Sequence, residues 1–148
     1  MLLLITRIRQ SHHDAIWEEQ KHFTWLLSII FSAQAVVLAG TELSAPDKAI
    51  IISIASVVGI LIALIGFRAQ RIEGVYYHRA NTHFAKEFLA VYPDAEEPHH
   101  SQAPNKAVLA LIKSAITGSA GVRDYFQIIF IAFFAVFTAI AIYAYISL

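Results

Sequence analysis

The sequence predicts an all-α membrane protein with three spanning helices, of which the first two form a hairpin extended into the cytoplasm. Of its 148 residues, 57% are hydrophobic and only 15% are charged, which is more apolar than an average soluble domain. The apolar residues gather in three blocks, and residues 49–67 carry no charge at all. A helix of that length crosses a hydrocarbon core of about 30 Å. A chain this short has no soluble bulk in which to bury three such helices.

The N-terminal part predicts one helix that enters the membrane. Residues 1–22 mix polar and apolar side chains and are typical of a cytoplasmic or interfacial helix. The first span follows over 23–43, where Phe23 and Trp25 suit the aromatic belt at a membrane interface. After a short connection, Pro46 suits the first turn of the next helix.

The second span, 49–67, is expected to leave the bilayer without a break. No helix breaker occurs before Pro93, so a cytoplasmic helical extension is predicted over 68–92. Because the first two spans are antiparallel about a turn near Ser44, facing residues should have numbers that sum to roughly 89. This register predicts contacts between the two helices outside the bilayer.

The register sets Glu18 beside Arg71 and Arg9 near Ala80. A salt bridge between Glu18 and Arg71 would align the helices just outside the membrane. Exposed pairs contribute only about 0–1 kcal/mol, so such a pair would set register more than stability.

The remaining chain predicts a linker, a surface helix and a third span. Residues 93–104 are rich in turn formers and read as a solvated linker. Residues 105–118 are too short to span, and predict an amphipathic interfacial helix or a lid. The third span covers 124–148, with Asp124 as its N-cap.

The distribution of Lys and Arg predicts the orientation. Three precede the first span, Lys48 alone lies between the first two spans, and seven lie between the second and third. This asymmetry places the N-terminus and the long loop in the cytoplasm and the C-terminus outside. We therefore expect a multi-pass protein of the inner (plasma) membrane.

Small residues on the spans predict close helix packing. Ala55, Gly59 and Ala63 recur every four residues in the second span, and Ser28 and Ser32 form a comparable face on the first. Small side chains let backbones approach where lipid provides no hydrophobic driving force. We expect these faces to pack helices together, including helices of neighbouring subunits.

Gln34 is the most polar side chain within any span. An amide in hydrocarbon needs a hydrogen-bond partner. It is expected either to bond within the monomer or to line a pore or a subunit contact.

Histidines near the N-terminus raise a metal hypothesis. His12, His13 and Asp14 are adjacent, and the hairpin register brings His78 within reach; imidazole and carboxylate groups bind transition metals. The alternative is that these are solvated or salt-bridged histidines at a membrane-proximal surface. Phosphate-binding loops, nucleophile elbows and zinc-protease motifs do not occur in the sequence, so neither catalytic residues nor a cofactor is predicted.

The order of features resembles a known family. It consists of WEEQKHFTWLLS leading into the first span and a second span that continues as FRAQRIEGVYYHRANTHFAKEFLAVYP. This layout resembles the small bacterial membrane proteins of the RipA type, described as octameric, and is similar to the SLATT two-span effectors. The best local match runs from Arg79 to Pro93 and resembles Tyr-Arg-x-Leu-Asn-x-x-Lys-Phe, with His83 in place of the lysine. The third span is additional to the two-span pattern.

These expectations lead to three hypotheses of function. The first is a non-enzymatic homo-oligomer in the lipid bilayer, acting as a channel-like assembly or a membrane scaffold without nucleic-acid partners. The second is an accessory subunit of a larger membrane complex, and the third a histidine-based metal-binding membrane protein.

Overall fold

The structure is a computed structural model that describes residues 2–95, 106–118 and 122–147. Within these ranges it contains helices and no strands. The helices are α1 (Leu2–Ala39), α2 (Ala45–Val91), α3 (Val108–Ile116) and α4 (Val122–Ser147). Three of them, α1, α2 and α4, are long and apolar enough to cross a membrane. The predicted all-α fold with three spanning helices is confirmed and indicates a multi-pass membrane protein.

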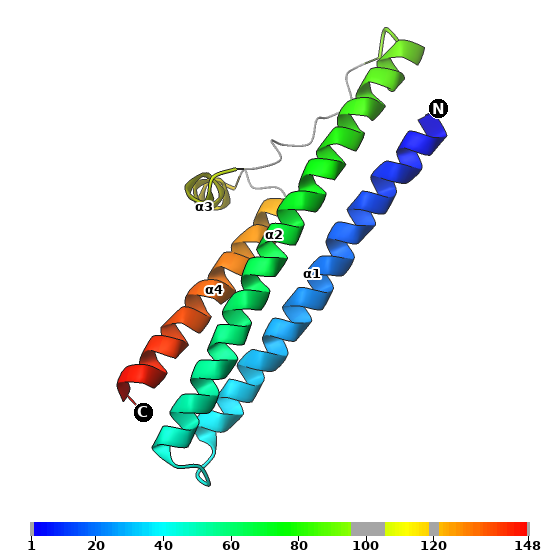
Figure 1. The fold of residues 1–148 in the computed structure, drawn as a ribbon. Helices are drawn as coiled ribbons and strands as arrows, with labels where there is room; N and C mark the ends of the chain where they lie inside the picture. Colours follow the sequence, from blue (N-terminus) through cyan, green and yellow to red (C-terminus); the bar gives the residue numbers. More distant parts are fainter. Residues whose placement is uncertain (1, 96–105, 119–121, 148) are drawn as a thin grey trace.

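The helix α2 is the centre of the bundle. It packs against α1 along one side and against α4 along another, and both neighbours run antiparallel to it (Figure 1). The short helix α3 lies beside the start of α4. The N-terminal end lies next to the end of α2, whereas α4 ends near the α1–α2 turn, so the two ends of the chain are at opposite ends of the bundle (Figure 1).

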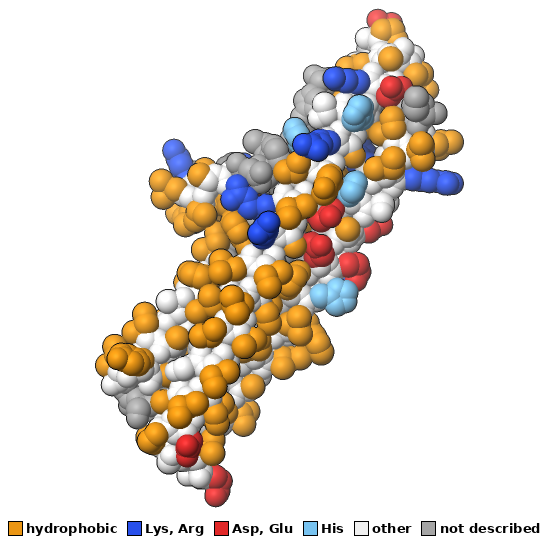
Figure 2. Space-filling view, viewed as in Figure 1, with side chains coloured by type: hydrophobic (Ala, Val, Ile, Leu, Met, Phe, Trp, Pro, Cys, Tyr) orange, Lys and Arg blue, Asp and Glu red, His pale blue; other side chains and the backbone are white. Residues whose placement is uncertain are grey.

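The α1–α2 hairpin has two parts, which we name by their composition. The apolar half comprises residues 23–39 of α1 and 45–67 of α2, and α4 packs beside it. The hairpin extension comprises residues 2–22 and 68–91 and continues roughly 35 Å beyond the apolar half. Figure 2 shows apolar side chains over the part that holds α4 and charged and histidine side chains over the other part.

The helix α2 is continuous through both parts, as the lack of a breaker before Pro93 predicts. Its N-cap is Ser44, whose hydroxyl accepts a hydrogen bond from the Asp47 backbone N–H at 3.4 Å, and Pro46 occupies the first turn as expected. At the other end, the Tyr92 N–H donates to the Phe88 carbonyl. The helix therefore begins four residues before the predicted span and ends at the predicted place.

The helix α1 ends before the predicted end of the first span. The helix α1 stops at Ala39 rather than at residue 43, and residues 41–43 bend. The chain must reverse before Ser44 caps α2, and the Lys48 ammonium donates to the carbonyls of Leu38 (3.5 Å) and Gly40. These bonds satisfy carbonyls that the end of a helix leaves without partners.

The predicted hairpin register is confirmed. The Gln34 amide donates to the Ser56 hydroxyl at 2.7 Å, and the rings of His13 and Tyr77 are 6.1 Å apart. Both pairs have numbers that sum to about 90, close to the predicted value. The agreement in the apolar half and in the extension shows that the two helices keep one register along their length.

The later elements are close to their predicted bounds. The surface helix is shorter than predicted, Val108–Ile116 in place of 105–118. Thr117 is its C-cap, and Gly118 follows with a φ of 70°, which suits glycine. Of the linker predicted at 93–104, only residues 93–95 are described, and they form a turn. The helix α4 begins two residues before the predicted third span, and residues 105 and 148 lie outside the described ranges.

The core lies between the three long helices of the apolar half. It is formed by Leu27 of α1, Ala63 of α2, and Phe130 and Phe137 of α4, all of them buried. A Cβ at Gly66 would lie 2.7 Å from the Phe130 ring, and one at Gly59 would lie 2.8 Å from the Phe137 ring. The two glycines therefore let the phenylalanine rings sit against the α2 backbone.

Candidate functional site

Buried polar side chains gather where the bundle changes from three helices to two. Gln20 of α1, Gln70 of α2 and Gln127 of α4 are all buried, and we call these three glutamines the polar layer. Two aromatic pairs join α1 to α4: the ring of Trp17 lies 4.9 Å from that of Phe126, and the ring of Phe23 lies 6.0 Å from that of Phe130. Gln20 lies between the two aromatic residues of α1, and Gln127 lies between the two of α4. The paired rings place the α1 and α4 glutamines at the same level.

Within the described part of the chain, each glutamine of the polar layer leaves part of its amide without a hydrogen bond. The Gln70 Nε2 donates to the Ile16 carbonyl at 2.9 Å, and the Gln20 Nε2 donates to the Thr24 hydroxyl at 2.8 Å. The oxygens of Gln20 and Gln70 and the nitrogen of Gln127 are buried without a partner among the described residues. Such groups cost free energy, which makes the layer a special feature rather than ordinary packing.

A titratable cluster lies next to the polar layer on the hairpin extension. The His12 Nδ1 lies 3.1 Å from the Glu73 carboxylate, and the His12 ring stacks on Tyr76 at 5.7 Å. Burial, followed by the charge of Glu73, raises the pKa of Glu19, whose Oε2 has no partner within the described ranges. The raised pKa favours the protonated form of Glu19.

The pKa of Glu18, the residue before Glu19, shifts in the opposite direction. Glu18 is exposed, and its bond to the Lys21 ammonium at 2.8 Å lowers the pKa of Glu18. Lys21 thus takes the place of the predicted partner Arg71, whose guanidinium lies 5.5 Å from the centre of the Phe67 ring. Glu18 lies on the outer face of α1 because Ile16 occupies the face toward α2.

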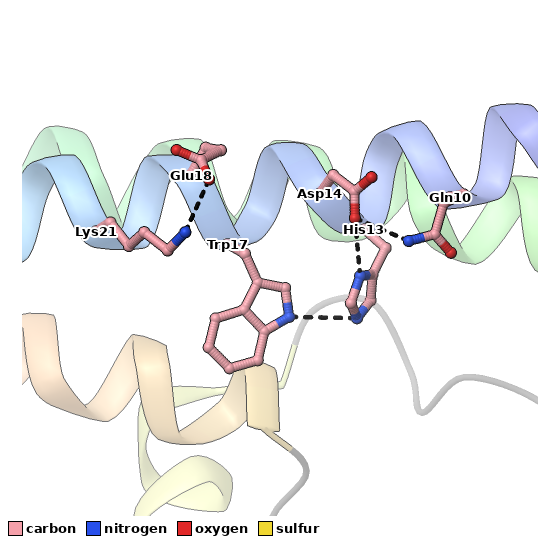
Figure 3. A network of polar contacts seen from close by, with 6 residues as sticks. All are labelled: Gln10, His13, Asp14, Trp17, Glu18 and Lys21. Carbon is pink, nitrogen blue, oxygen red and sulfur yellow. Dashed lines mark hydrogen bonds and ion pairs between the residues drawn. The ribbon is translucent and has the colours of Figure 1, made fainter.

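Further polar contacts join exposed side chains along α1. The Gln10 amide donates to Asp14 at 2.8 Å, the His13 Nδ1 lies 3.5 Å from Asp14, and the Trp17 indole N–H donates to His13 at 3.2 Å. Figure 3 shows the Trp17 and His13 rings on the same side of α1, toward α4. The contact of Trp17 with Phe126 joins this chain of contacts to α4.

The predicted metal ligands do not come together. Among the described residues, no three His, Asp or Glu side chains are close enough to hold a metal ion. His12 crosses to Glu73, His13 stays with Asp14 and Trp17, and His78 does not join them. Consecutive helical residues point in different directions, so adjacency in sequence did not produce a ligand cluster.

The predicted packing residues of α2 are used inside the monomer. Gly59 and Ala63 are buried in the three-helix core, and Ala55 is half-buried. Gln34 is 2% exposed and donates to the Ile52 carbonyl (3.2 Å) as well as to Ser56, which favours the intramolecular interpretation over a pore lining.

The sequence prediction missed the full buried stripe. Ser56, Gly66, Gln70 and Gly74 are also buried, and the spacing of three and four residues along α2 could have revealed them.

The predicted serines of α1 face outward. Ser28 and Ser32 line an open apolar groove of about 410 Å³ between α1 and α4, with further walls from both helices: Phe31, Ile129, Ala132, Phe133 and Val136. The Ser28 hydroxyl donates to the Thr24 carbonyl of its own helix.

In comparisons with family models, curated proteins and solved structures, nothing matches this chain.

Proposed function

We propose that this protein is a non-enzymatic, self-associating membrane scaffold that holds a helical hairpin at the cytoplasmic surface of the inner membrane. One observation carries the proposal: apolar side chains are exposed on the hairpin extension. Leu3 and Leu4 are 82% and 60% exposed, and Val91 and Tyr92, at the adjacent end of α2, are each 54% exposed. Lipid covers apolar side chains on a span, but an apolar patch in water is typical of an interaction surface.

The orientation in this proposal rests on charge. Ten of the eleven Lys and Arg residues lie before the first span or between the second and third. That bias favours a cytoplasmic N-terminus and an external C-terminus. The two chain ends lie at opposite ends of the bundle, as this orientation requires.

A scaffold is favoured over a water-filled pore because the spans offer little polar surface. Residues 23–39, 49–67 and 125–146 contain no charged side chain, and Gln34 is bonded internally. The hydroxyls of Ser28 and Thr138 donate to carbonyls of their own helices. The groove beside Ser28 and Ser32 supports close approach of another subunit within the membrane, and the resemblance to the octameric RipA type supports self-association.

The test is the mass of the protein in mild detergent, measured by mass photometry. We expect a discrete homo-oligomer, and we expect the double variant Leu4→Glu/Val91→Glu to form smaller species because it places charge in the apolar patch. Ser11→Glu, at an exposed polar position of α1, is the control and should keep the wild-type mass.

The other outcomes of this measurement point to other functions. A monomeric wild type, or an unchanged mass for the double variant, contradicts the scaffold. A stoichiometric second chain would instead favour the accessory-subunit hypothesis. Discrete conductance steps in planar bilayers would favour a pore.

A further inference from the structure

A small apolar cavity lies on the face of α2 and α4 that points away from α1. Its volume is about 260 Å³, and its wall is formed by side chains of three helices: Ala63, Leu64, Phe67, Val108, Phe130, Ile131 and Phe134. Val108 is the first residue of α3, so α3 closes one side. Leu64 and Phe134 remain partly exposed, which leaves the cavity open toward the lipid.

Basic side chains continue the same face of α2 beyond the apolar half. Phe67, Arg68 and Arg71 follow Leu64 by three, four and seven residues, and these helical spacings place all four side chains on one face. The Arg71 guanidinium lies over the Phe67 ring, 5.5 Å from its centre, which fixes the charge at the edge of the cavity. Arg68 is exposed beside it.

The helix α3 is held at the same level. The Lys106 ammonium binds the buried Asp124 carboxylate at 2.7 Å, which fixes the segment before α3 to the start of α4. The side chains of Leu109 and Ile116 are each 81% exposed, and Lys113 is exposed on the same helix. Figure 2 shows Lys and Arg side chains gathered around α3 at the border of the apolar part. An exposed apolar face with basic neighbours is typical of a helix lying in a membrane interface.

We propose that this cavity binds an anionic phospholipid of the leaflet on the side of the hairpin extension. An acyl chain lies against Phe67, Phe130 and Phe134, and the headgroup phosphate is bound by Arg68 and Arg71 one turn above. The exposed apolar side chains of α3 enter the same leaflet beside it. Charge selects the lipid, because a zwitterionic headgroup gains less from the two arginines.

The experiment is native mass spectrometry of the full chain in detergent, titrated separately with phosphatidylglycerol and phosphatidylcholine. We expect tighter binding of phosphatidylglycerol to the wild type. Basic residues near an anionic lipid surface contribute about fivefold each, so Arg68→Gln/Arg71→Gln should weaken phosphatidylglycerol binding by about 30-fold and leave phosphatidylcholine unchanged. The matched control is Arg79→Gln/Lys86→Gln, which removes the same charge at exposed positions farther along the extension.

A second variant tests the cavity itself. Ile131→Trp enlarges a side chain of the cavity wall and should weaken binding of both lipids, whereas Ile129→Trp, in the groove between α1 and α4, should not. Circular dichroism confirms that each variant keeps its helix content. Equal binding of the two lipids by the wild type overturns the proposal. So does an equal loss in the Arg79/Lys86 control, or unchanged binding by Ile131→Trp.

Discussion

The apolar half and the hairpin extension are built from the same two helices, but different forces hold them together. In the apolar half, α4 completes a three-helix bundle in which Phe130 and Phe137 fit against Gly66 and Gly59. In the extension, α1 and α2 meet through polar and aromatic pairs. His12 lies beside Glu73, and the Arg9 guanidinium lies 4.5 Å from the centre of the Phe84 ring. Shape specifies the first region, and directional polar and aromatic contacts specify the second.

This difference determines how each region responds to substitution. Close packing leaves no free space between the helices, so a larger side chain in the apolar half must move a helix. Partly exposed ion pairs and ring contacts are worth only about 0–1 kcal/mol each, so single changes in the extension have small effects on stability.

The largest effect is expected for Gly59→Leu. A Cβ at this position already lies 2.8 Å from the Phe137 ring, including its Cγ, so the larger side chain must displace α4. Overpacking of this kind costs about 1–3 kcal/mol or more. Thermal unfolding followed by circular dichroism in detergent should show a lower Tm. Tryptophan fluorescence should change as well, because the Trp17 ring contacts Phe126 of α4.

Val57→Leu is the matched control for that change. Val57 is exposed on the lipid-facing surface of the same helix, two residues away. Its substitution should leave the Tm within the error of the measurement. An equal Tm for Gly59→Leu and Val57→Leu would show that α4 does not pack against this stripe.

An intermediate effect is expected for Lys106→Gln, at the junction of the two regions. The Asp124 side chain is only 3% exposed and would lose its bond to the Lys106 ammonium. A hydrogen bond to a charged group contributes about 1.5–3 kcal/mol. Hydrogen exchange measured by mass spectrometry should become faster in α3, whereas Lys113→Gln, at an exposed position, should leave it unchanged.

Features that arise from a short stretch of chain could be predicted from the sequence in both the apolar half and the hairpin extension. Local signals determine the long helix α2 and the hairpin register, because no breaker precedes Pro93 and a tight turn at Ser44 sets which residues face each other. Gly59 and Ala63, which belong to the small-residue pattern, are both buried. These features depend on short stretches of chain, so the sequence alone contains enough information about them.

Features that depend on a distant partner could not be predicted. Small residues show that a helix comes close, but not that the helix is α4 of the same chain rather than a neighbouring subunit. The buried stripe alternates spacings of three and four residues, which keep side chains on one face of a helix, so Ser56 is buried whereas Ala55 beside it is only half-buried. The environment of Glu19 likewise requires Glu73, which lies far away in sequence.

The smallest effect is expected at Glu19, in the hairpin extension. Burial and the charge of Glu73 raise the pKa of Glu19 in the folded state. A raised carboxyl pKa favours the protonated form, so stability is highest below the ordinary carboxyl pKa and falls as the pH rises through the raised one. Glu19→Gln removes this loss, and should raise the Tm near neutral pH by an amount corresponding to less than about 1 kcal/mol.

Glu18→Gln, one residue away, should have the opposite sign. The bond to Lys21 lowers the pKa of Glu18, so its contribution is present above the ordinary carboxyl pKa and is lost as the pH falls through the lowered one. Near neutral pH this variant should lower the Tm slightly, and in strong acid both variants should match the wild type. The pair of Tm profiles therefore distinguishes a carboxylate held between two helices from one on the outer face of the same helix. Parallel profiles for the two variants would mean that Glu19 is solvated like Glu18, and that α1 and α2 do not close around the cluster of His12 and Glu73.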